Sequence, residues 1–229
     1  MTNRTGIICA MEKESRGLIS RMTDVSTENI CGMEYCLGKL GGRDVVIATC
    51  GIGKVLAAAC AQTMIIKYSP DEIINTGVAG SLSDGLGIYD IVIASGVVQH
   101  DFDTSPIGDP VGCAFGGKVV IPSSGVMADA FEDCAKTLGN KYVRGIVATG
   151  DQFIADGEKK SRIAKLFGAI ACEMEGGAIG TVCYAAGVDF SILRAISDSG
   201  NSGVEYNTFA EEAARRSCAM IIEYLGSKA

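Results

Sequence analysis

Carboxylates are the side chains of this 229-residue chain best placed to do chemistry, because four predicted strands each run into a short segment that holds or adjoins an acid. The chain has one histidine, His100, which leaves little room for a serine or cysteine triad or for a histidine-rich metal site. Paired acids can instead protonate a leaving group and activate water, each tuned by its own surroundings. The four segments are residues 10–14, 150–154, 173–175 and 194–198.

Two of these acids allow both a structural and a functional interpretation. Glu175 follows a predicted strand and precedes a glycine- and alanine-rich helix, so it can serve a ligand or the dipole of that helix. Asp198 ends the apolar run 190–198, and the same two roles are open to it. Arg194 lies inside that run, and a buried arginine needs an anionic partner. We therefore expect a carboxylate beside Arg194.

Two glycine-containing segments resemble ligand loops only in part. Residues 51–54 (GIGK) are followed by Leu56, where a dinucleotide fingerprint has its third glycine, and they also lack the spacing of a P-loop. A tight turn of bare backbone near a ligand is the preferred interpretation. Residues 75–80 (NTGVAG) predict a strand that passes into a glycine turn. Asp101, Asp103 and Asp109 do not have the spacing of a calcium loop, so we expect no metal.

Composition narrows the class of protein. The formal net charge of -7 makes a nucleic-acid backbone an unsuitable partner, whereas a small neutral or cationic molecule fits. The ten cysteines contain no C-x-x-C pair, and several lie in apolar runs, which favours reduced, buried thiols in a cytoplasmic protein. We expect neither a signal peptide nor a membrane-spanning segment.

Short apolar runs alternate with helical patterns, which predicts an α/β fold with a largely parallel sheet and helices on both faces. We expect a single domain, 1–229, and a ligand site at the carboxyl ends of the strands. A hairpin should form around Gly41-Gly42, and residues 101–117 should form a long loop. Strands are predicted at 5–10, 33–40, 43–50, 71–76, 88–98, 118–121, 143–149, 169–173 and 190–196. Helices are predicted at 12–22, 53–68, 123–138, 157–167, 176–186 and 205–225.

As a set, six segments strongly resemble the bacterial methylthioadenosine/S-adenosylhomocysteine nucleosidase family, and they occur in order along nearly the whole chain. They are residues 6–14 (GIICAMEKE), 51–54 (GIGK), 74–77 (INTG), 150–153 (GDQF), 173–175 (EME) and 194–198 (RAISD). The resemblance implies a three-layer α/β/α fold of the purine nucleoside phosphorylase type with a central mixed, largely parallel sheet. It also implies a homodimer that hydrolyses the adenine–ribose bond of these nucleosides to adenine and a thioribose product, with no metal and no cofactor.

The resemblance also implies roles for individual residues. Glu14, rather than the nearer Glu12, would activate water, Asp198 would protonate the purine N7, and Glu175 would hold the ribose hydroxyls. The loop 101–117 would reach the alkylthio pocket of the neighbouring subunit. The other substrate-binding positions would be Met11, Ile52, Val78, Phe153, Ile154, Met174, Arg194, Ser197 and Tyr206.

One position departs from the family pattern, and other functions stay open. Many members have a serine after Asn-Thr-Gly, and this chain has Val78, so a hydroxyl beside the ribose is lost. Hydrolysis of aminodeoxyfutalosine shares the same adenine and ribose, and phosphorolysis of a purine nucleoside would use phosphate in place of water. From another class of protein, a nucleoside-binding sensor would need neither the base nor the acid that the chain retains.

Overall fold

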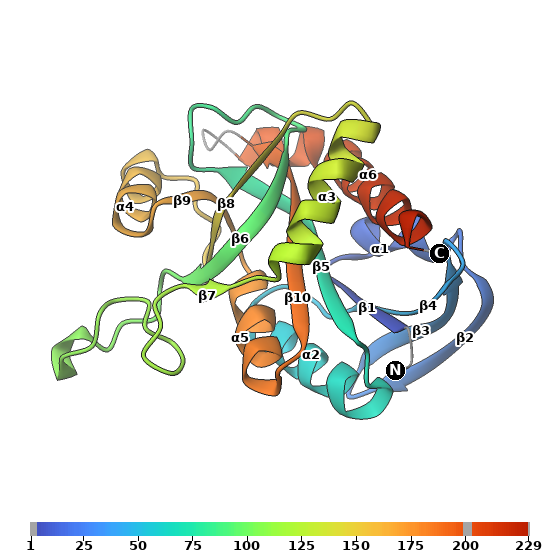
Figure 1. The fold of residues 1–229 in the computed structure, drawn as a ribbon. Coiled ribbons are helices and arrows are strands. Elements are labelled where there is room, and N and C mark those ends of the chain that lie inside the picture. The colour runs from blue at the N-terminus through green and yellow to red at the C-terminus, as the bar shows by residue number, and fades with distance from the viewer. Residues whose placement is uncertain (1–3, 199–202, 229) are drawn as a thin grey trace.

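The computed structural model describes residues 4–198 and 203–228, whose helices and strands form three layers (Figure 1). In chain order the elements are β1 (Arg4–Cys9), α1 (Glu12–Ile19), β2 (Thr23–Ile30), β3 (Met33–Leu40), β4 (Arg43–Thr49), α2 (Lys54–Tyr68), β5 (Glu72–Ser81), β6 (Ile91–Gln99), the short 3-10 helix η1 (Ser105–Ile107), β7 (Ile121–Pro122), α3 (Gly125–Thr137), β8 (Tyr142–Thr149), α4 (Gly157–Phe167), β9 (Ala169–Glu173), α5 (Gly176–Ala186), β10 (Asp189–Asp198) and α6 (Gly203–Ser227).

The described strands form one mixed ten-stranded sheet, in the order β10-β6-β8-β9-β5-β1-β4-β3-β2, with β7 paired to β6. Its centre is parallel, since β1 runs parallel to both β4 and β5, and β5 runs parallel to β10. The expected hairpin of β3 and β4 is confirmed as an antiparallel pair in which Leu40 faces Arg43. The α/β class and the mixed sheet are therefore as predicted.

Apolar side chains fill both faces of the sheet, as a sheet buried on two sides requires. On one face, Leu18 of α1, Phe131 of α3 and Tyr224 of α6 pack with the central strands. On the other face, Met64 of α2 and Ile179 of α5 do the same. Figure 1 shows α3 and α6 on one side of the strands and α2 and α5 on the other.

Part of the sheet closes into a small barrel, which the strand pattern did not predict. Strand β10 pairs with β6 at one edge and also with β5, so that β5, β9, β8, β6 and β10 form a ring. Register shifts lie in three of these strands, between Ala94 and Gly96, between Ile146 and Val147, and between Ile196 and Asp198. Such bulges bend and twist a strand, which allows the sheet to curl onto itself.

Two element predictions were wrong. Strand β2 was not foreseen, because its side chains are exposed on both faces and carry no alternating apolar pattern; backbone pairing with β3 holds it. The predicted glycine turn after residue 76 does not exist, since β5 continues to Ser81 through Gly77 and Gly80. These glycines make room for side chains from other elements: a Cβ at Gly77 would overlap Arg194 and Glu14, and one at Gly80 would lie 2.9 Å from Asp198 Oδ1.

Smaller differences concern element ends. The strand predicted at 118–121 is limited to β7, and the helix predicted to reach residue 22 ends at Ile19. The loop 101–117 is irregular apart from η1, as expected. Over the described part of the chain, none of the helices combines the length and the apolar character needed to cross a membrane.

The close packing at Gly77 predicts that Gly77→Ala destabilises the protein by about 1–3 kcal/mol, because the new methyl group must displace Arg194 or Glu14 from a packed interior. Thermal or denaturant unfolding measures the change. Gly85→Ala is the matched control, because its Cβ would make only an ordinary contact at 3.6 Å with Ser83 Oγ. Equal stability of the Gly77 and Gly85 variants would contradict the packing described here.

Candidate active site

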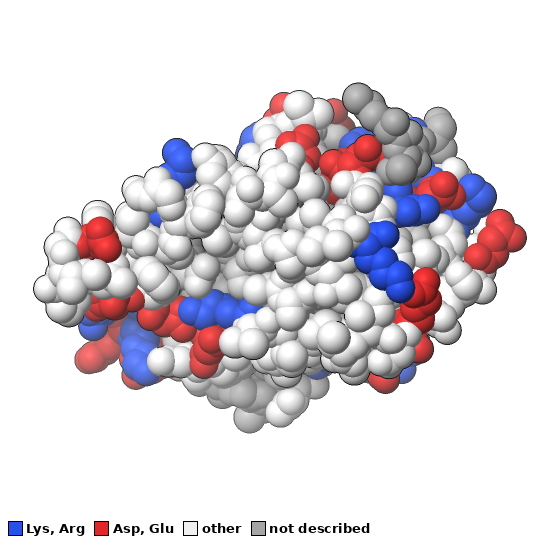
Figure 2. All heavy atoms as spheres, turned by 90° about the horizontal axis from the view of Figure 1, so that it is seen from below, with Lys and Arg blue, Asp and Glu red and all other residues white. Residues whose placement is uncertain are grey.

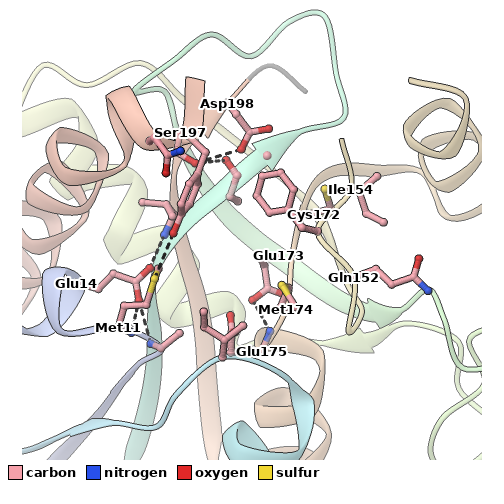
Figure 3. Close-up of a pocket in the computed structure, with 18 residues that line it drawn as sticks. Met11, Glu14, Gln152, Ile154, Cys172, Glu173, Met174, Glu175, Ser197 and Asp198 are labelled. Atoms are coloured by element: carbon pink, nitrogen blue, oxygen red, sulfur yellow. Dashed lines mark hydrogen bonds between the residues drawn. The ribbon is translucent and has the colours of Figure 1, made fainter. Parts of the chain in front are cut away.

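A pocket of about 500 Å³ lies where the ends of several strands meet. Glu14 after β1, Glu175 after β9 and Asp198 at the end of β10 all line it, and Figure 3 shows them approaching it from different elements. Of the other residues predicted to bind substrate, the pocket is lined by Met11, Ile52, Val78, Phe153, Ile154, Met174, Ser197 and Tyr206. Arg194 is the exception, since it lies behind the pocket wall and is 1% exposed.

Glu14 is a buried carboxylate held by backbone donors. Its Oε2 accepts from the N–H groups of Ala10 (2.9 Å) and Met11 (3.0 Å), and its Oε1 accepts from the N–H of Val78 at 3.2 Å. Burial raises the pKa of Glu14, while Arg194 and these N–H groups oppose the rise. Glu12, two residues earlier, is exposed. The start of α1 therefore points one fixed, poorly hydrated acid into the pocket.

Arg194 organises the acids behind the pocket and has the anionic partners that the sequence required. Its Nη2 donates to Glu173 Oε2 and to Asn75 Oδ1, and it lies 3.7 Å from Glu175 Oε2. Glu173 also accepts from the N–H groups of Glu175 (3.1 Å) and Gly176 (2.7 Å). Glu173 thereby fixes the turn from β9 into α5, from which Glu175 reaches the pocket.

Glu175 joins this network to the glycine turn at 51–54. The N–H of Gly53, a residue with φ of 100°, donates to Glu175 Oε1 at 2.9 Å. This geometry agrees with the interpretation of the segment as bare backbone near a ligand site. Burial, followed by repulsion from Glu173, raises the pKa of Glu175 to about 7, while Arg194 acts in the opposite direction.

Asp198 has a different set of neighbours. Its Oδ2 accepts from Ser197 Oγ at 3.3 Å, and Lys160 Nζ of α4 lies 3.4 Å from its Oδ1. Lys160 is 7% exposed and also donates to the carbonyl of Ser81 at 3.2 Å. The sequence analysis missed Lys160, because it lies in an ordinary charged helical segment with no motif around it.

Apolar and aromatic side chains line the remainder of the pocket. The rings of Phe153 and Tyr206 meet edge to face with centroids 5.6 Å apart. Tyr206 Oη accepts from Lys13 Nζ (2.9 Å) and donates to Met11 Sδ (3.2 Å), which ties α6 to the start of α1. The pocket residues that the sequence analysis did not select are Ala10, Ala79, Gly80, Gln152, Cys172, Glu173 and Asn207.

Asp101 has a structural role at the edge of this site. It pairs with Lys54 Nζ at 2.6 Å and accepts from the N–H of Asp151 at 2.8 Å, while Asp151 accepts from the N–H of Lys54 at 2.8 Å. These bonds hold the segment before Phe153 against the start of α2. Within residues 4–198 and 203–228, no group of three or more His, Cys, Asp or Glu side chains has a metal-binding arrangement.

The charges around the pocket favour a positively charged species. Four acids, Glu14, Glu173, Glu175 and Asp198, face two buried cations, Arg194 and Lys160, among the described residues. Such an excess of negative groups in a buried site stabilises positive charge that develops on a bound molecule. It also disfavours a bound anion.

Comparison with known proteins agrees with this architecture. The Phosphorylase superfamily pattern matches residues 4–226. A 5'-methylthioadenosine/S-adenosylhomocysteine nucleosidase of Shewanella loihica is 38% identical over 226 residues, which are 97% of this chain and 98% of that protein. The crystal structure of the Neisseria meningitidis nucleosidase of the same name, in complex with methylthio-immucillin-A, is 32% identical with a TM-score of 0.95, covering 98% of this chain and 99% of that one.

A futalosine hydrolase of Helicobacter pylori has the same fold, with a TM-score of 0.95 at 28% identity over 99% of both chains. Its sequence is less similar to this chain than that of the Shewanella nucleosidase. The matches extend from β1 to α6 and include all four segments that converge on the pocket. The chain therefore belongs to the methylthioadenosine/S-adenosylhomocysteine nucleosidase family of the phosphorylase superfamily.

Proposed function

We propose that this protein hydrolyses the N-glycosidic bond of methylthioadenosine and S-adenosylhomocysteine, releasing adenine and the thioribose product. The observation that carries the proposal is the convergence of Glu14, Glu175 and Asp198 on one pocket, each in different surroundings. The similarity to nucleosidases along nearly the whole chain supports the same activity. Neither a metal nor a cofactor enters the proposed reaction.

In the proposed mechanism, Asp198 donates a proton to the purine N7, and the bond between the sugar and the base breaks as positive charge develops on the ribose. The excess of carboxylates stabilises that charge. Glu14 removes a proton from the attacking water, and Glu175 accepts hydrogen bonds from the ribose hydroxyls. Arg194 holds Glu173 and Glu175 in place from behind the pocket.

The other predicted positions bind the substrate. Phe153 packs on the adenine, and the backbone of Ile154 contacts its edge. The apolar side of the pocket is formed by Met11, Ile52, Met174 and Tyr206, all of which line it. Val78 contributes an apolar side chain where many family members have a hydroxyl, while its N–H holds Glu14. Ser197 donates to Asp198.

The charge of the site favours water over phosphate as the nucleophile. No lysine or arginine is among the residues that line the pocket in the described part of the chain, whereas Glu14, Glu173, Glu175 and Asp198 do line it. A phosphate dianion placed among these carboxylates would be repelled. This argues against phosphorolysis of a purine nucleoside.

We also propose that the protein is a homodimer whose subunits meet through α2 and α5. Helix α2 buries Ala57, Cys60 and Met64 against the sheet, yet Val55 and Ile66 on its other side are 78% and 73% exposed. Figure 2 shows the face that carries α2 and α5 with a broad central area free of charged side chains. Exposed apolar side chains on the outer side of a helix, in an area free of charge, are typical of an interface.

One aromatic contact joins the loop 101–117 to this face. Phe115 packs edge to face on Tyr184 of α5, with ring centroids 6.3 Å apart, and both side chains are partly exposed. The exposed Ile52 lines the pocket two residues before α2 begins, so a second subunit on this face would lie at the edge of the pocket.

The ten cysteines, all free and eight of them buried, support a cytoplasmic location.

The first prediction of the proposed function is that purified protein releases adenine from methylthioadenosine without phosphate. Glu14→Gln and Asp198→Asn should each lower kcat at least 100-fold, because each removes a proton-transfer group. Adenine release is measured by chromatography. Glu12→Gln is the control, since the Glu12 side chain is exposed and is not among the residues that line the pocket. Strict dependence on phosphate, or higher kcat/KM on aminodeoxyfutalosine, would redirect the assignment.

The second prediction concerns pH. Glu14 and Glu175 act as carboxylates, and both have raised pKa values, that of Glu175 about 7. An acid with a raised pKa stays protonated until the pH exceeds that pKa. The kcat/KM for methylthioadenosine should therefore fall as the pH drops through about 7. Assays from pH 5 to 9 test this, with enzyme returned from pH 5 to pH 8 to exclude acid inactivation. A constant kcat/KM between pH 8 and 5 would contradict it.

The third prediction is that Val55→Glu converts the dimer to a monomer, because it places a charge in the centre of the proposed apolar interface. Light scattering after size-exclusion chromatography gives the mass of each species. Lys136→Glu is the charge-changing control, because the Lys136 side chain is exposed on α3, on the other side of the sheet from α2 and α5. A monomeric wild-type protein would refute the dimer, whatever the variants do.

A further inference from the structure

Lys160 is a buried cation that the proposed mechanism does not use. It lies on α4, where its side chain is 9% exposed, and its Nζ is within reach of two oxygens, Asp198 Oδ1 at 3.4 Å and the carbonyl of Ser81 at 3.2 Å. Removing an ammonium group from water costs several kcal/mol unless anions and dipoles replace the water. The placement of Lys160 therefore depends on these two oxygens.

Few other groups act on this end of Asp198 in the described part of the chain. From β9, the Cys172 thiol faces the pair, but burial raises its pKa to about 12, so it stays protonated and uncharged near neutral pH. From β10, Ser197 supplies a neutral hydroxyl, and from β5, Gly80 supplies only backbone. Arg194 is engaged with Glu173 and Glu175. Lys160 is thus the cation that bears directly on Asp198.

We propose that Lys160 is a positioning residue for Asp198, which it holds by Oδ1 while its charge stabilises the carboxylate that remains after the proton passes to the base. This inference rests on the proposed function. In the step concerned, the O–H bond of Asp198 breaks and an N7–H bond forms, while the electron pair of the C1'–N9 bond moves into the purine. The aspartate gains a negative charge as this happens, and the ammonium lies 3.4 Å from it.

The position of Lys160 on α4 gives it a second effect. Helix α4 begins at Gly157, just after Phe153 and Ile154, the segment proposed to contact the adenine. The Lys160 side chain therefore joins the segment that contacts the base to the acid that protonates it. This link keeps the Asp198 carboxyl group and the adenine in the geometry that proton transfer needs.

Lys160→Met tests the proposal, because it keeps an unbranched side chain only one atom shorter and removes the charge. On methylthioadenosine we expect kcat to fall about tenfold, since the aspartate product is no longer stabilised. Lys160→Arg, which retains the charge, should restore most of the rate.

A substrate with a different leaving group separates chemistry from structure. On 4-nitrophenyl 5-methylthioribofuranoside the leaving phenolate needs no proton, so Lys160→Met should turn over this compound at the wild-type rate. Lys165→Met, an exposed lysine on the same helix, is the matched control and should behave as wild type on both substrates. Thermal unfolding checks each variant, and Lys160→Gln, an uncharged donor, replaces the Met variant should that one not fold.

Three results would overturn the proposal: a fully active Lys160→Met variant, an equal loss of rate on both substrates, or a Lys165→Met variant as impaired as Lys160→Met. The failure of the proposed function looks different, since wild-type protein would then release no adenine from methylthioadenosine. An active wild-type enzyme with a fully active Lys160→Met variant refutes the role of Lys160 alone.

Discussion

The contact between the buried Arg194 guanidinium and the Glu173 carboxylate is the interaction on which the rest of the site depends. Arg194 comes from the middle of β10 and Glu173 from the end of β9, and both are almost entirely removed from water. Two such charges need further partners for their remaining polar atoms. Asn75, Glu175 and the N–H groups at the start of α5 supply several of these, while Nε of Arg194 has no hydrogen-bond partner among the described residues. The pair therefore fixes the end of β9 relative to β10 and β5.

The close approach of Arg194 to β5 constrains the backbone there. Gly77 leaves space for the guanidinium and for Glu14, and Gly80 leaves space for the Asp198 carboxylate. A side chain at either position would push a charged group out of place. The two glycines are thus explained by what packs against them from β10 and α1, and β5 remains a regular strand.

The acids of the pocket differ because their neighbours differ. Glu14 has three backbone donors, Glu175 has one donor and a nearby acid, and Asp198 has a hydroxyl and a lysine. Chemically identical groups can perform separate tasks when their surroundings favour different protonation states. The three acids thus lie in separate surroundings, and Lys160 extends the site to a residue outside the motifs of the family.

The sequence by itself determined the order of most strands and helices, the family, and the need of Arg194 for an anion, because apolar periodicity and short motifs are local properties of the chain. It also placed the acids at strand ends, where parallel strands bring loops together. Only the tertiary structure decided the closure of the barrel, the course of β5 through Gly77 and Gly80, and the existence of the polar strand β2. It alone paired Lys160 with Asp198, 38 residues apart in the chain. Contacts of that kind depend on how elements pack in space, and no pattern of neighbouring residues encodes them.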